Sequence, residues 1–88
     1  MFRRSLIRKQ VDLGIEYNHL TIWYRNIIDE ISKVKLGSDI NDADTLAYIR
    51  KLEKAKKKAK RRKSKIYRKM FRLYVNYGIT SPYLNIRV

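Results

Sequence analysis

The side chains best suited to chemistry in this sequence are lysines and arginines, which gather in its second half. Residues 1–49 carry equal numbers of acidic and basic groups, so the whole net charge of +14 belongs to residues 50–88. A dense array of cations binds phosphate groups, and the counterions that it releases make such binding strong and independent of base sequence. The residues predicted to contact nucleic acid are Arg50, Lys51, Lys54, Lys56, Lys57, Lys58, Lys60, Arg61, Arg62, Lys63, Lys65, Arg68, Lys69 and Arg72.

Other chemistry finds little support in the sequence. There is no cysteine and only one histidine, His19, so a disulfide framework and a thiolate zinc site are excluded. Asp39, Asp42 and Asp44 lack the glycine and the distal glutamate of a calcium loop, and helix capping accounts for them. No serine has the neighbours of an activated nucleophile, and there is no glycine-rich phosphate loop. We therefore expect no enzymatic activity, no metal and no cofactor.

The first half of the chain has the period of a helix that packs lengthwise on another helix. Large apolar residues recur at steps of three and four, with Gln10 as a polar interruption. The pattern predicts a helix over about residues 4–36, within an apolar-striped segment that spans residues 1–36. The residues of the stripe are Leu6, Leu13, Tyr17, Leu20, Tyr24, Ile27, Ile31 and Val34.

A second helix is predicted over about residues 41–77, and the basic segment spans residues 42–77. Gly37 and Gly78 follow the two helical patterns, as helix stops often do. Asp39 or Asn41 is the expected N-cap, with Asp42 and Asp44 in the first turn. The inward positions of this helix are Thr45, Ile49, Leu52, Lys56, Ala59, Lys63, Ile66, Met70, Leu73 and Tyr77, apolar at both ends and basic in the middle.

Two long helices joined by the short turn at residues 37–41 predict an all-α antiparallel hairpin that forms a single domain over residues 1–88. Facing residues then have numbers that sum to about 78. Both ends of the hairpin match apolar to apolar. In the middle, large side chains would face Lys56, Ala59 and Lys63 and stay partly uncovered.

The incompletely covered stripe predicts self-association into a homo-oligomer or filament, because exposed large apolar side chains lose roughly 1.5–3 kcal/mol each relative to burial. The expected assembly interface consists of Leu13, Tyr17, Leu20, Trp23, Tyr24, Ile27, Ile28 and Ile31. Tyr67, Phe71 and Tyr74 share another helical face, where they either stack on bases or pack against a second subunit.

The last residues, 78–88, form an expected extended tail in which Leu84, Ile86 and Val88 alternate. Two interpretations stay open: the tail docks on a neighbouring subunit, or it is a loose terminus.

The function expected from these features is sequence-independent binding and packaging of nucleic acid, with duplex DNA favoured over RNA. A virion nucleoprotein, a DNA-coating capsid subunit and an architectural DNA-binding protein all fit. The alternative is a small RNA-bound structural protein, such as a ribosomal component. A membrane-surface helix is disfavoured because the basic block from Lys56 to Lys63 interrupts the apolar face. The N-terminal residues lack a signal-peptide core, so we expect an intracellular or virion location.

Overall fold

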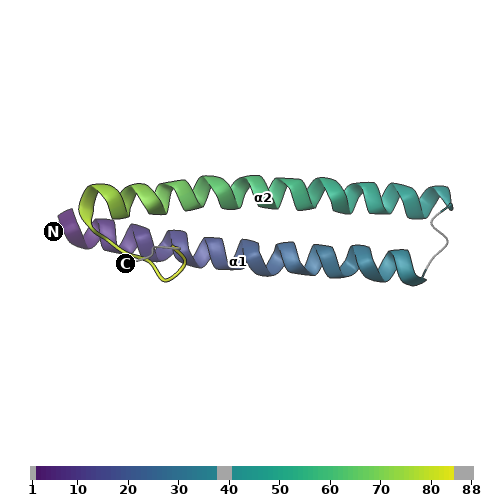
Figure 1. Ribbon diagram of the computed structural model, residues 1–88, viewed down its shortest axis with the longest axis horizontal. Coiled ribbons are helices and arrows are strands. Elements are labelled where there is room, and N and C mark those ends of the chain that lie inside the picture. Colours follow the sequence, from purple (N-terminus) through teal and green to yellow (C-terminus); the bar gives the residue numbers. More distant parts are fainter. Residues whose placement is uncertain (1, 38–40, 85–88) are drawn as a thin grey trace.

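The computed structural model describes residues 2–37 and 41–84, and of Phe2 only the backbone. Helix α1 comprises Phe2–Gly37 and helix α2 comprises Ala43–Tyr77. The two helices lie antiparallel and side by side over their whole length (Figure 1). The molecule is a rod of 57 × 24 × 15 Å. This arrangement confirms the prediction of an all-α hairpin, and no strand occurs among the described residues.

The register of the hairpin is the expected one. The Arg62 side chain donates to Glu16 Oε1 from Nε at 3.1 Å and from Nη2 at 2.9 Å. Nearer the turn, the hydroxyl of Tyr48 donates to Glu30 Oε1 at 3.2 Å. This hydrogen bond, together with the negative charge of Glu30, raises the pKa of Tyr48 above its ordinary value. Both cross-helix pairs join residues that the sequence places opposite each other.

The start of α2 differs slightly from the prediction. Its N-cap is Asp42, with extended backbone angles, and Asp44 lies in the first turn. The Asp42 carboxylate accepts a hydrogen bond from the Thr45 hydroxyl at 3.2 Å. Asn41 therefore lies one residue before the cap, and the other candidate, Asp39, lies outside the described residues together with the rest of 38–40.

The end of α2 depends on Gly78, as predicted. Its φ of 68° lies in the left-handed region, which residues with a Cβ adopt only at a cost. The Gly78 N–H donates to the carbonyl of Tyr74 at 2.8 Å, which closes the helix and turns the chain back toward α1.

Gly78→Ala is expected to lower the free energy of unfolding by about 1 kcal/mol, because alanine is strained at a positive φ. Gly37→Ala is the matched control, since a Cβ at Gly37 meets nothing within 4 Å and its φ is not positive. That control should leave stability unchanged or raise it by a few tenths of a kcal/mol. Urea unfolding of the two variants checks the difference, and equal effects at both glycines would contradict it.

The predicted extended tail is wrong for residues 81–84. They form a turn, closed by a hydrogen bond from the Leu84 N–H to the Ser81 carbonyl at 3.1 Å. Ile79 and Leu84 are buried. The tail folds back beside the N-terminal half of α1 (Figure 1). The alternation at Ile86 and Val88 lies outside the described residues, which end at residue 84.

Gln10, the polar interruption in the stripe, holds this end of the molecule together. Its side-chain Nε2 donates to the carbonyl of Met70 at 3.0 Å and to the carbonyl of Ile79 at 2.9 Å. Gln10 is only 2% exposed, so both bonds are shielded from water. Close by, the ring of Tyr83 lies over Gly14, where a Cβ would approach it to 3.0 Å. The tail thus packs on α1 at two positions, Gln10 and Gly14, that carry no large apolar side chain.

The principal core cluster lies at the same end. Leu20, Ile66, Met70 and Leu84 are buried together, and half-buried aromatic rings surround them. Met70 is fully enclosed. Within the described residues, no helix is long and apolar enough to cross a membrane.

Candidate nucleic-acid interface

The basic residues of α2 are presented by a strongly amphipathic helix. Ala59, Ile66, Met70 and Leu73 are buried against α1, which fixes the rotation of α2 about its axis. The exposed positions on the other side of the helix carry most of its lysines and arginines. Packing on α1 therefore fixes the direction in which these charges point. It also supports a helix that, in isolation, like-charge repulsion would destabilise at every turn.

Twelve of the fourteen predicted contact residues are exposed, and Lys56 and Lys63 are only partly so. Those two occupy inward positions of the helical period, so their alkyl chains cover apolar surface. The Lys63 ammonium lies 4.9 Å from the centre of the Tyr17 ring and 5.7 Å from that of Tyr24. Lys56 pairs with Glu53 at 3.2 Å. Neither lysine belongs to the outer surface with the other twelve, in agreement with the inward positions that the helical period gave them.

Few carboxylates neutralise this surface. Across residues 2–37 and 41–84, the salt bridges are Lys56–Glu53 and the Arg62–Glu16 pair at 2.9 Å. Both are solvent-exposed, where such pairs contribute little stability. The other cations of α2 have no acidic partner within the described chain, so their charge is directed at solvent.

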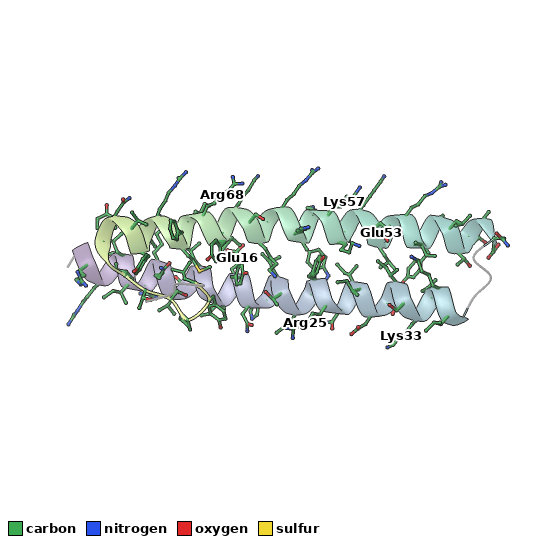
Figure 2. The ribbon with its side chains drawn as sticks, in the orientation of Figure 1. Glu16, Arg25, Lys33, Glu53, Lys57 and Arg68 are labelled. Carbon is green, nitrogen blue, oxygen red and sulfur yellow. The ribbon has the colours of Figure 1, made fainter. Side chains whose placement is uncertain are left out.

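We call the exposed basic residues from Arg50 to Arg72 the outer face of α2. Figure 2 shows Lys57 and Arg68 directed away from α1. The interval from Arg50 to Arg72 measures about 33 Å along the helix at 1.5 Å per residue, close to one turn of duplex DNA. Two neighbouring hollows lie on this face, with volumes of about 720 and 380 Å³, and share Lys57, Arg61 and Lys65 in their walls.

A different pocket lies on one flank, between the helices. Its volume is about 430 Å³, and three tyrosines line it with three cations and a serine: Tyr17, Tyr24, Lys60, Lys63, Ser64, Tyr67 and Arg68. Tyr17 and Tyr67 are in ring contact, with centroids 6.1 Å apart. The sequence gives no sign of this pocket, because the spacing of Tyr17 and Tyr24 places them in the apolar stripe of the first helix. Their placement beside Tyr67 depends on the interhelical packing, which no spacing within one helix reveals.

The other aromatic residues of α2 divide between core and surface. Tyr74 packs on the core cluster, as Tyr67 does. Phe71 remains exposed, with its ring centre 6.4 Å from that of Tyr74. Tyr67 and Tyr74 therefore contact this chain's own core.

The expectation that the middle of the apolar stripe stays uncovered is wrong for Leu20, and two further residues of the expected assembly interface, Ile27 and Ile31, are also covered. These side chains are buried within the single chain. The fully buried Ala59 allows close approach of the helices, while Leu84 of the tail adds cover to Leu20. Leu13, Tyr17 and Tyr24 are half-buried, and Trp23 and Ile28 remain exposed.

No group of three potential metal ligands occurs within the described residues. His19 is exposed and lies beside Glu16 and Trp23 at the edge of a shallow hollow. Asp42 is the N-cap of α2 and Asp44 lies in its first turn, as described above.

The fold and surface together define a class: a two-helix hairpin with a cationic outer face on one helix and few neutralising carboxylates. The chain matches no known family model, and comparisons with curated proteins and with solved structures likewise give no match.

Proposed function

We propose that this protein binds nucleic acid through the outer face of α2, by contacts to phosphate and without reading base sequence. The observation that carries the proposal is the row of exposed cations from Arg50 to Arg72, nearly all without an acidic partner in the described chain. Neutralisation of these charges by phosphate removes their mutual repulsion and releases counterions from the nucleic acid. The role is one of binding, with no catalytic step.

Duplex DNA is the favoured ligand. The outer face extends about 33 Å along α2, which matches one helical turn of the duplex. Side chains that read base edges by bidentate hydrogen bonds from an amide are scarce on α2, whose only such residue is Asn76. Phosphate contacts fix position without carrying sequence information, so we expect similar affinity for all duplex sequences.

The biological role that fits this chemistry is packaging or coating by an oligomer, inside a cell or a virion. A small rod that covers about one duplex turn needs many copies to cover a genome-sized molecule. A virion nucleoprotein, a DNA-coating capsid subunit and an architectural DNA-binding protein share this requirement.

A salt titration tests the binding. The protein is titrated against duplex DNA and structured RNA of equal length, over a series of salt concentrations. We expect the logarithm of the association constant to fall steeply with the logarithm of salt concentration, and a cooperative isotherm on duplex DNA. Micromolar or weaker binding to both ligands at low salt, with no salt dependence, would contradict the proposal.

The alternative is an RNA-bound structural protein, and the flank pocket is the observation that favours it. Three tyrosines beside Lys60 and Arg68 offer ring faces and cations to an unpaired base and its phosphate. Preference for structured RNA with one-to-one saturation in the same titration would favour this alternative over DNA packaging.

A further inference from the structure

The flank pocket between the helices adjoins the outer face of α2. It shares Lys60, Ser64 and Arg68 with the outer-face hollow of about 380 Å³. These three residues follow one another at steps of four, so they form one row along α2. We call this row the rim of the pocket. A ligand whose phosphates lie on the outer face is therefore in contact with the edge of the pocket as well.

Behind the rim, the pocket is lined by three aromatic rings and one further cation. Tyr17 and Tyr24 come from α1, and Tyr67 comes from α2. The Lys63 ammonium lies 4.9 Å from the centre of the Tyr17 ring and 5.7 Å from that of Tyr24. Tyr17 is also in ring contact with Tyr67 and Tyr83, which fixes it as part of the wall. Tyr24 has no such ring partner within the described residues, so its ring can receive a ligand.

This lining suits an anion with a flat aromatic part. Three of the lining residues are cations, none of the described lining residues is acidic, and neither salt bridge of the described chain involves these cations. Cationic side chains and a serine hydroxyl donate hydrogen bonds to phosphate, and tyrosine rings stack on bases of any identity. The pocket volume of about 430 Å³ falls within the range of about 300–1,000 Å³ that small-ligand sites have. A nucleotide combines the phosphate and the flat ring in one ligand.

We propose that the flank pocket takes one unpaired nucleotide of the nucleic acid that the outer face of α2 holds. The phosphate of this nucleotide lies on the rim, and its base stacks on Tyr24 with the Lys63 ammonium at the base edge. Every base carries ring-nitrogen or carbonyl acceptors on its edge, so a lysine donor there discriminates little among bases. The inference rests on the proposed function, because the outer face supplies the strand.

The pocket makes the protein sensitive to unpaired nucleotides. A base inside an intact duplex reaches the pocket only by extrusion from the stack, and the cost of extrusion is least where the base is already unpaired. Bulges and frayed ends provide such nucleotides in DNA. We therefore expect a fully paired duplex to bind through the outer face alone, and a duplex with an unpaired nucleotide to bind more tightly.

Two duplexes that differ by one base test the pocket. Both are DNA of the same sequence and length with a one-nucleotide bulge, which is a deoxyadenosine in one and an abasic residue in the other, so their phosphate charge is equal. We expect the wild-type chain to bind the deoxyadenosine bulge at least about fivefold more tightly, the low end of what stacking of one base on an aromatic side chain contributes. Equal affinity for the two duplexes would overturn the proposal.

Variants at Tyr24 locate the preference, because Tyr17 and Tyr67 pack on the core cluster and are left intact. Tyr24→Leu should abolish the preference for the base and leave the affinity for the abasic bulge unchanged, since it removes the ring and no charge. Tyr24→Phe should keep the preference, because stacking requires the ring alone. Tyr48→Leu is the matched control, an exposed tyrosine of α2 outside the pocket, and should also keep it. A Tyr24→Leu variant that retains the preference would overturn the proposal.

The same titrations separate this inference from the proposed function. Absence of salt-dependent binding to either duplex contradicts the proposed function, whereas equal binding to both contradicts only the pocket. Free deoxyadenosine monophosphate is a second source of the same chemistry. We expect it to bind at least about tenfold more weakly than the deoxyadenosine bulge, because it makes no further phosphate contacts along the outer face. Free nucleotide that binds as tightly as the bulge would overturn the assignment of the pocket to a nucleic-acid strand.

Discussion

Replacement of Lys57, Arg61 and Lys65 by glutamate is expected to weaken binding to duplex DNA by roughly 100-fold at ~0.15 M salt. The three residues are exposed and follow one another at steps of four on the outer face of α2. Each phosphate contact contributes about 0.9 to the slope of log affinity against log salt concentration, so the slope should fall by about 2–3. The same titration measures both quantities.

The control variant changes charge equally at a different place. Arg4, Arg8 and Lys33 are exposed residues of α1, and their replacement by glutamate lowers net charge by the same amount. We expect this control to lose much less affinity, because its charges lie away from the outer face of α2. Equal losses in the two variants would show that net charge alone governs binding and that α2 is not the contact surface.

Unfolding cannot account for the expected loss in the α2 variant. The three glutamates would still repel one another at i,i+4, but each would gain attractive i,i+3 pairs in place of repulsive ones, with Lys54, Lys58, Lys60, Arg62 and Arg68. Helix content should be unchanged or higher. Circular dichroism on the free variant checks this point before the titration.

Gln10→Glu is expected to lower the free energy of unfolding at neutral pH by about 3 kcal/mol or more. The substitution keeps the size of the side chain but replaces an amide that donates two hydrogen bonds with a carboxylate that only accepts. The carboxylate would lie about 3 Å from the carbonyl oxygens of Met70 and Ile79, in a site closed to water.

The effect depends on pH in a defined direction. Burial and the facing carbonyls should raise the pKa of the introduced carboxyl above the ordinary value of about 4.3. A group whose pKa is raised on folding favours the folded state below its unfolded pKa. The penalty is therefore smallest below about pH 4 and grows as pH rises through the raised pKa. Urea unfolding of wild type and variant at each pH gives the difference directly.

Gln10→Met separates the charge from the lost hydrogen bonds. Methionine has a similar volume and no donor, so we expect a pH-independent loss of about 1–2 kcal/mol, because the Ile79 carbonyl loses its donor and the Met70 carbonyl keeps only its bond within α2. A glutamate variant with the same pH-independent loss would contradict the assignment of Gln10 as a buried donor to two carbonyls.

Much of the fold followed from local signals. The three-and-four periodicity of α1, the sparse glycines and the short turn predicted two antiparallel helices, and the Glu16–Arg62 and Tyr48–Glu30 contacts confirm their register. The ends of α2 were predicted less well. The helix stop at Gly78 was predicted correctly, whereas the expected N-cap was Asp39 or Asn41 and the N-cap is Asp42. A turn rich in Asp and Asn offers several residues with similar capping chemistry, and the side chains alone do not choose among them.

The sequence by itself determined the charge asymmetry, the helical hairpin and the choice of α2 as the candidate interface, because charge and periodicity are properties of residue order. Tertiary structure decided which apolar residues are covered. Ala59 and the folded-back tail allow Leu20 to be buried, which one helix's pattern does not reveal. It also left Val11 and Ile15 exposed on the opposite side of α1. Burial depends on what the rest of the chain brings to each side of a helix, and a period within one helix reports only which residues share that side.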